Sequence, residues 1–361
     1  MHRVRLHYTL AGDAGPELIR HPLIDFLQAV AERGSISGAA RALDMSYRHV
    51  WGQLKHWETS LGQPLIHWEK GQPARLTEFG AKLMWAERQA QARLMPQIEA
   101  LRADLERAFA IAFDDSAHVL TIYASHDAAL VALAEHTRSA RLHLDVRFTG
   151  SVDAIRALNE GRCTLAGFHT RLDPALGSLA QRTYKPLLRP GLHKLIGFAR
   201  RSQGLIVAPG NPLGLRSLAD LRRCRFANRA RGTGTRVLLE DLLAECDIAP
   251  HAIDGFEREE PSHAAVAQAV ASGTVDAGFG IEASARARGL SFVPLVEEHY
   301  HLACLKSTLD QPATAALLAV LATADWQNRL AALPGYMPAD SGQVLAMSKI
   351  LPWWQFRRPK A

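Results

Sequence analysis

Beyond Asp114-Asp115, apolar segments switch repeatedly between strand-type and helix-type patterns, and this alternation restricts the fold more than any other feature. Short apolar runs typical of buried strands occupy residues 119–124, 144–148, 164–168, 195–200, 205–208, 226–228, 277–281 and 300–305. Helical patterns occupy residues 128–137, 152–159, 263–271 and 314–321, and a further helix starts at Thr235. Apolar strands that alternate with helices predict a mostly parallel sheet covered on both faces.

A chain of 361 residues is too long for one ordinary core and indicates two or three compact units. Hydrophobic residues make up 48% and charged residues 22%, the balance of a globular rather than a disordered protein. The formal net charge of +6 permits a polyanionic partner without requiring one.

The four cysteines are widely separated and form no CxxC pair, which argues against a disulfide framework or a structural zinc site. Residues 1–15 lack the apolar core of a signal peptide, and no apolar run approaches the roughly 20 residues that span a membrane. We therefore expect a cytoplasmic protein with no membrane partner.

Residues 23–83 predict three short helices, a hairpin and the start of a long helix. The first helix stops at Arg33-Gly34, Ser35 can cap the second, and Ser46 can cap the third. Residues 65–76 then form a short hairpin with a charged turn, and Thr77 caps a helix whose apolar stripe extends from Leu83 to Phe109. Helix, turn, helix and β-wing together specify a winged helix-turn-helix.

The third helix has the polar surface that a DNA-reading helix needs in the major groove. The wing adds basic groups that can reach neighbouring phosphates, which provides affinity rather than sequence preference. Taken singly, each of these side chains is also compatible with an ordinary solvated surface. The predicted DNA-binding residues are Ser46, Tyr47, Arg48, His49, Gln53, Lys55, Lys70 and Arg75.

The stretch from Leu23 to Leu83 resembles the DNA-binding domain of LysR-type and ModE-type regulators. The residues that carry this resemblance are Phe26, Val30, Gly34-Ser35-Ile36-Ser37, Ala39-Ala40, Leu43, Leu54, Trp57-Glu58, Leu61-Gly62, Leu65 and Leu76-Thr77-Glu78-Phe79-Gly80. The sequence of residues 45–51 is more similar to the molybdate-responsive ModE branch, and the choice between the two branches stays open. In both branches the long helix pairs two protomers, so the resemblance implies a homodimer or homotetramer on double-stranded operator DNA.

Residues 228–236, Asn-Arg-Ala-Arg-Gly-Thr-Gly-Thr-Arg, lie between a predicted strand and a predicted helix. Glycines allow a tight turn, and the free amides of a helix N-terminus together with its dipole favour an anion. Threonine hydroxyls and arginine side chains add further donors. The alternative is a tight loop whose threonine merely caps the helix, because an isolated glycine motif is a weak signal.

Two other segments end predicted strands, Ser125-His126-Asp127 and His169-Thr170. In an open parallel sheet ligands gather at the carboxyl ends of strands, so all three segments should face one cleft. The predicted ligand-binding residues are Ser125, His126, Asp127, His169, Thr170, Arg229, Gly232, Thr233, Gly234, Thr235, Arg236 and His263.

The region from Val119 to about Leu333 resembles the periplasmic-binding-protein-like domain of molybdate- and tungstate-related regulators. The resemblance rests on residues 124–127, 166–169, 228–236, 262–273 and 276–282. It implies a sensor of a small anionic effector rather than an enzyme. Molybdate sites of this kind consist mostly of hydroxyls and amides, whereas the present segments add arginines and histidines, which leaves room for a carboxylate such as formate.

No cofactor, metal site or catalytic residue is predicted. The sixteen histidines contain no HExxH pair and no close spacing with cysteine. Ser125, His126 and Asp127 cannot form a simple triad, because sequence neighbours at a helix start point in different directions. Two other functions are alternatives. The missing signal peptide and the N-terminal domain argue against a transporter's solute-binding protein, whereas a cytoplasmic enzyme fused to a DNA-binding domain stays open.

The predicted organisation has an N-terminal α-rich winged helix-turn-helix over residues 21–80 and a long linker or dimerisation helix over residues 81–114. An α/β two-lobed periplasmic-binding-protein-like domain follows over residues 116–340.

Overall fold

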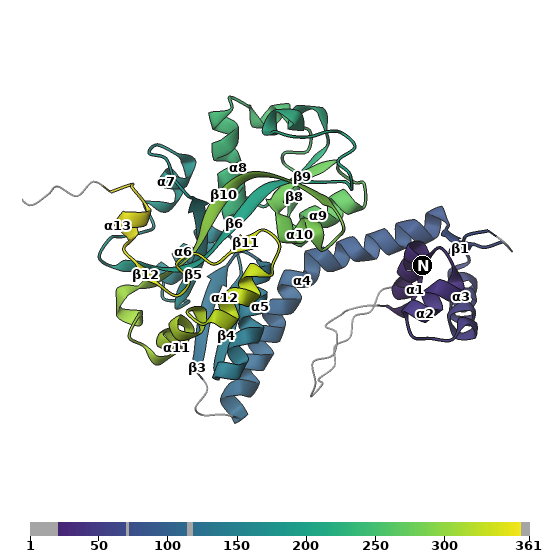
Figure 1. Cartoon of the computed structure of the whole chain (residues 1–361), viewed down its shortest axis with the longest axis horizontal. Coiled ribbons are helices and arrows are strands. Elements are labelled where there is room, and N and C mark those ends of the chain that lie inside the picture. The colour runs from purple at the N-terminus through teal and green to yellow at the C-terminus, as the bar shows by residue number, and fades with distance from the viewer. Residues whose placement is uncertain (1–20, 70–71, 114–117, 355–361) are drawn as a thin grey trace, which may run out of the picture. The chain divides into compact units, whose positions relative to one another are not determined.

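The computed structural model describes residues 21–69, 72–113 and 118–354, which divide into two compact units, Met1–Gln91 and Ala92–Ala361 (Figure 1). Helix α4 (Glu78–Phe113) belongs to both units. It begins where the sequence predicts, because the Thr77 hydroxyl oxygen accepts a hydrogen bond from the Gly80 amide at 3.0 Å. Over the described ranges, no helix has both the length and the apolar character needed to cross a membrane.

The first unit has the predicted helix-turn-helix and wing. Its elements are α1 (Pro22–Arg33), α2 (Ile36–Ala42), α3 (Tyr47–Leu61) and the antiparallel pair β1 (Ile66–His67) and β2 (Arg75–Leu76). Gly34 ends α1 at φ +62°, a left-handed conformation that suits glycine. Ser35 caps α2 and Ser46 caps α3, as their positions predict. The apolar faces of the three helices enclose a small core with Phe26, Leu27 and Leu54 at its centre.

The second unit contains an α/β fold built on one large sheet. Its longer elements are β3 (His118–Ala124), α5 (Ala128–His136), β4 (Leu142–Phe148), α6 (Ser151–Asn159), β5 (Leu165–Arg171), α7 (Leu179–Tyr184), β6 (His193–Val207), β7 (Phe226–Arg229), α8 (Gly234–Glu245), α9 (His263–Ala271), β9 (Ala277–Ile281), α10 (Glu282–Arg286), β10 (Ser291–Leu305), α11 (Pro312–Leu321) and α12 (Ala324–Ala331). The short elements are β8 (Glu259–Glu260), β11 (Tyr336–Met337), β12 (Val344–Leu345) and α13 (Met347–Ile350).

The strand order in the described sheet is β4-β3-β5-β10-β6-β9-β7-β8, with β11 and β12 also paired to β6. The outer pairs β3/β4, β3/β5, β7/β9 and β7/β8 are parallel. The inner pairs β5/β10, β6/β10 and β6/β9 are antiparallel. The prediction of a mostly parallel sheet is therefore wrong at the centre, and the sheet is mixed.

Two long strands account for this error. The sequence predicts two separate strands at 195–200 and 205–208 and a late strand at 300–305, whereas β6 and β10 each run through 15 residues. Polar residues interrupt the apolar pattern of each strand, at Arg201 and Gln203 in β6 and at Glu298 in β10. These side chains are nevertheless buried, because they bond to one another.

Each part of the sheet has its own apolar core. One core joins β3, β4 and α5 to the C-terminal helices and includes Leu144, Phe198 and Trp326. Another lies under α8 and includes Phe226, Leu239 and Phe279. The two long strands β6 and β10 run through both halves (Figure 1), so the polar side chains in the middle of these strands lie between the two cores.

Candidate functional site

The described residues predicted to bind DNA gather at the start of α3 and on the wing. Ser46, Tyr47, Arg48 and His49 are exposed, and the Ser46 hydroxyl oxygen caps the helix by accepting from the His49 amide at 3.1 Å. Gln53 is half-buried one turn later, and Arg75 is exposed on β2. Lys70 lies outside the described residues.

Lys55 differs from the other predicted contacts because it already has partners. Its ammonium group lies 2.7 Å from a Glu58 carboxylate oxygen and 4.7 Å from the centre of the Trp51 ring. Glu58 also accepts from the Leu65 amide at 2.8 Å, so it ties α3 to the wing. Burial works to raise the pKa of Glu58, but the bonds from Lys55 and the backbone hold it below its ordinary value.

An aromatic row that was not predicted from the sequence lies beside this helix. Tyr47 stacks on Trp51 with ring centres 6.5 Å apart, and Trp51 contacts Trp68 of the wing at 5.3 Å. Tyr47 and Trp68 are exposed. The i, i+4 spacing of Tyr47 and Trp51 is the signal that could have placed them on one helical face.

In the second unit, a buried ionic cluster joins the ends of β3 and β5 to the middle of β6 and β10. The Arg201 guanidinium pairs with the carboxylates of both Asp127 and Glu298. Asp127 also caps α5 through the Ala129 and Leu130 amides and accepts from the Tyr336 hydroxyl at 2.5 Å. All three charged side chains are at most 2% exposed.

Neutral polar groups extend this cluster to the loops that the sequence singled out. His169 Nδ1 lies 2.7 Å from Glu298 Oε2, and Gln203 Nε2 donates to Glu298 Oε1 at 2.7 Å. Gln203 Nε2 also donates to the Thr235 hydroxyl at 3.1 Å. Thr235 in turn lies 3.4 Å from His263 Nε2. The N-cap of α5 and residues from β5, β6, α8, α9 and β10 are thus brought together, as the convergence of strand ends predicts.

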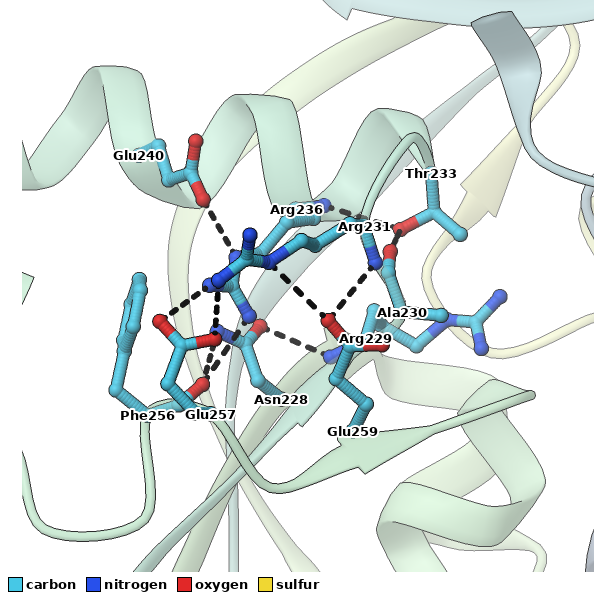
Figure 2. A network of polar contacts seen from close by, with 10 residues as sticks. All are labelled: Asn228, Arg229, Ala230, Arg231, Thr233, Arg236, Glu240, Phe256, Glu257 and Glu259. Carbon is cyan, nitrogen blue, oxygen red and sulfur yellow. Dashed lines mark hydrogen bonds and ion pairs between the residues drawn. The ribbon is translucent and has the colours of Figure 1, made fainter. Parts of the chain in front are cut away.

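Arg229 and Arg236, both predicted to bind the ligand, have different surroundings. Arg236 bonds to Glu240 at 2.6 Å and to the Phe256 carbonyl at 3.1 Å, within the network of polar contacts drawn in Figure 2. The Arg229 guanidinium extends away from that network (Figure 2) and donates through Nη1 to the Glu260 carbonyl at 2.8 Å. Within the part of the chain that the structure describes, no carboxylate pairs with the buried Arg229 guanidinium.

Several buried polar atoms around the cluster have no hydrogen-bond partner among the described residues. They are Ser125 Oγ, His169 Nε2, Arg201 Nη2, Gln203 Oε1, Arg229 Nε, His263 Nδ1 and Tyr300 OH. Leaving so many buried polar groups unpaired costs roughly 1–3 kcal/mol each. A polar ligand could form hydrogen bonds with these atoms, and most of them can act as donors.

The electrostatics of the cluster are dominated by its two arginines. Burial and the nearby Arg201 charge lower the pKa of Arg229 to about 9. Burial, together with the charges of Arg229 and Arg201, holds the pKa of His263 well below its ordinary value. Burial opposes ionisation of Glu298, but Arg201 and His169 outweigh it and lower its pKa to about 2. At neutral pH the site therefore combines two cationic arginines with a neutral His263.

The glycines of the loop allow close packing in the cluster. A Cβ atom on Gly234 would lie 2.4 Å from the His169 ring, so the close approach of α8 to His169 requires glycine. Gly232 takes φ +79°, and its carbonyl accepts from the Val152 amide at 3.3 Å. Thr233 caps α8 through the Arg236 amide, which is the structural role considered for this loop from the sequence.

Two predicted ligand-binding residues lie beside the cluster. His126 Nε2 lies 2.8 Å from a Glu99 carboxylate oxygen on α4. Thr170 follows His169 on β5, and successive strand residues point to opposite faces of a sheet. A hollow lined by His169, Thr170, Gly234 and Asp241, among others, borders the cluster. A larger hollow, lined by Glu99, Leu130 and Phe148 among others, lies away from it.

Five residues of the cluster were not predicted from the sequence: Arg201, Gln203, Glu298, Tyr300 and Tyr336. Arg201 and Gln203 are two residues apart on one strand, so they share a face, and this spacing was the available signal. Among the described residues, no group of three or more histidine, cysteine, aspartate or glutamate side chains is arranged to hold a metal ion.

Comparison with known families matches both units. Residues 23–81 match the bacterial regulatory helix-turn-helix protein model of the lysR family, and residues 132–322 match the PBP superfamily domain. The chain is 29% identical to Uncharacterized protein YvgK of Bacillus subtilis (strain 168) over 222 residues, which cover 61% of this chain and 71% of that protein. It is 31% identical over 110 residues to an uncharacterized protein in the ferredoxin 2Fe-2S gene 5′ region of Clostridium pasteurianum, covering 30% of this chain and 97% of that protein.

Among solved structures, CbnR, a LysR family transcriptional regulator, is similar with a TM-score of 0.38 and 20% identity. The match covers 83% of this chain and 98% of CbnR.

Proposed function

Because the chain belongs to the PBP superfamily and carries a lysR-family helix-turn-helix, we propose that this LysR-type transcriptional regulator responds to a small anion. The anion would bind beside Arg229, next to the buried cluster that contains Arg201 and His263. Regulators of this type are not enzymes, which removes the alternative of an enzyme fused to a DNA-binding domain. We also propose that the regulator acts in the cytoplasm, because operator DNA is found there.

The buried Arg229 guanidinium carries the proposal. A buried charge normally has an opposite charge beside it, because an isolated ion is costly to remove from water. Asp127 and Glu298 both pair with Arg201, and the Glu260 carboxylate pairs with Arg93. An anion next to Arg229 Nε would supply the missing charge and bond to that unpartnered donor.

The chemistry of the cluster favours an oxyanion or a small carboxylate. Hydroxyl donors suit molybdate or tungstate, whereas a guanidinium fork matches a carboxylate such as formate in a bidentate manner. Either ligand also lies near the N-termini of α8 and α9, whose first amides have no acceptor within their own helices.

Isothermal titration of the full chain with molybdate, tungstate, sulfate, phosphate and formate tests this proposal. Arg229→Gln should weaken binding of the best anion at least tenfold, as expected for a charge-assisted bond. Arg231→Gln is the matched control, because Arg231 is two residues away, exposed, and paired with Glu257 outside the cluster. Equal affinity in the wild type and Arg229→Gln would remove Arg229 from the site.

We infer that the exposed start of α3 reads operator DNA, with Arg48 as its main base contact. A bidentate bond from arginine to guanine discriminates by roughly 1–3 kcal/mol. Arg48→Ala should therefore weaken operator binding about tenfold or more in gel-shift titration at fixed salt, while thermal unfolding stays unchanged. Lys82→Ala, a change at another exposed basic residue, on α4, serves as the control. Unchanged operator affinity in Arg48→Ala would exclude this contact.

We also infer pairing of two chains through α4, in a homodimer or homotetramer. Leu94 and Leu101 are seven residues apart on this helix and are 42% and 54% exposed. This spacing places both on one helical face, where a second copy of the helix would bury them.

A further inference from the structure

Helix α4 has an unusual acceptor at the point where it meets the second unit's loops. Pro96 lies inside the helix and has no backbone N–H, so the Ala92 carbonyl lacks its normal partner four residues later. The Ser262 hydroxyl donates to this carbonyl at 3.1 Å. Ser262 is also the N-cap of α9, whose first residue is His263 of the cluster.

A second contact lies directly beside the first. Arg93 donates to both carboxylate oxygens of Glu260, at 2.9 and 2.7 Å. The Glu260 side chain is 1% exposed, and the carbonyl of the same residue accepts from Arg229 Nη1. Glu260 thus bonds to α4 through its carboxylate and to Arg229, the proposed anion-binding arginine, through its carbonyl.

A third contact lies about two helical turns beyond Ala92 on α4, where Glu99 approaches His126 at 2.8 Å. His126 follows Ser125, whose buried hydroxyl has no partner among the described residues. Ala92, Pro96 and Glu99 are spaced by four and three residues, so one face of the helix makes these contacts. That face meets two of the loops that form the anion-binding cluster.

We propose that this face of α4 is a latch whose strength depends on whether an anion is bound. Two contacts make up the latch: the hydrogen bond from Ser262 to the Ala92 carbonyl, and the ion pair between Arg93 and Glu260. The inference rests on the proposed function for its ligand, a small anion. An anion bonded to both Arg229 and the start of α9 links β7 to α9 and restrains the segment 260–263. Ser262 and Glu260 then hold α4 more firmly, and the same helix continues into the DNA-binding unit.

Hydrogen exchange on the full chain tests the latch without any ligand. Ser262→Gly removes the hydroxyl but retains most of the capping preference. It should speed exchange of amides 93–104 about three- to tenfold, the change in opening expected from one lost hydrogen bond. Pro96→Ala restores the donor within the helix, so adding Ser262→Gly to Pro96→Ala should have little further effect on these amides.

Two controls separate the latch from general destabilisation. Ser178→Gly makes the same change at the N-cap of α7, where it removes the hydroxyl that accepts from the Gln181 amide, and it should affect that helix alone. Arg93→Gln changes a half-exposed side chain and should speed the same α4 amides even if Ser262→Gly folds poorly. Wild-type exchange at residues 93–104 in both Ser262→Gly and Arg93→Gln would overturn the latch.

The ligand arm uses sodium molybdate and sodium formate as separate probes. An anion that binds in calorimetry should slow exchange of amides 93–104 in the wild type about threefold or more. In Ser262→Gly this slowing should be lost while binding persists. An anion that binds without any change at these amides would overturn the latch. Failure of every anion to bind would instead reject the proposed effector, and the ligand-free arm would still decide whether the latch exists.

Discussion

Replacing Arg201 by methionine removes the guanidinium that two buried carboxylates share. Asp127 and Glu298 would remain in the interior without their main partner, because methionine fills the space but cannot donate. Breaking a buried pair on one side typically costs about 3–5 kcal/mol. The linkage between protonation and folding gives a free-energy cost of similar size. A pKa of about 2 for Glu298, against an ordinary value of 4.5, corresponds to about 3 kcal/mol.

The pH dependence of this loss identifies its cause. A lowered carboxyl pKa stabilises the fold above pH 4.5, and that stability disappears as the pH falls through about 2. Without Arg201, burial raises the pKa of Glu298 instead, so the folded variant takes up a proton under mildly acidic conditions. The difference in unfolding free energy between wild type and Arg201→Met should therefore shrink between pH 7 and pH 5.

Urea unfolding of the full chain at both pH values measures this difference. Arg200→Met is the matched control, because Arg200 neighbours Arg201 on β6 but pairs with Glu297 near the surface. Such exposed pairs contribute about 0–1 kcal/mol, with little change over this pH range. A loss below 1 kcal/mol in Arg201→Met, or an equal loss at pH 7 and pH 5, would refute the ionic account of the cluster.

Three further outcomes follow from the structure. Gly234→Ala should push the His169 ring off Glu298 and weaken anion binding about tenfold in calorimetry; unchanged affinity would separate this loop from the site. Burial lowers the pKa of His301 to about 3, so the fold should lose about 2 kcal/mol between pH 7 and pH 5 from this residue. His301→Leu should remove that part of the acid sensitivity in urea titrations, and an identical pH profile would contradict it. Leu101→Lys should convert a dimer to a monomer in light scattering, whereas Leu213→Lys, at an equally exposed leucine, should leave it intact.

The helix-turn-helix could be predicted almost completely because its determinants are local. Ser35, Ser46 and Thr77 each bond to a backbone amide three residues later, so a cap and the apolar spacing behind it define each helix start. Gly34 similarly marks the end of α1. None of these features depends on residues far away in the chain.

The loops around the buried polar cluster could also be predicted, since strand ends in an α/β sheet converge on one region. His169, Thr235 and His263 do come together there. Their partners could not be predicted, because Arg201, Gln203 and Glu298 occupy the middle of strands and look like interruptions of the apolar pattern.

The sequence by itself determined where helices begin, which segments alternate as strands and helices, and which loops cluster at strand ends. Only the tertiary structure decided that β6 and β10 run unbroken and antiparallel through the centre of the sheet. It also decided which arginine has a carboxylate partner among the described residues, Arg236 rather than Arg229. The reason is that capping and periodicity act over a few residues. Burial of a charge, in contrast, requires an opposite charge beside it, and that partner can lie almost a hundred residues away, as Glu298 does from Arg201.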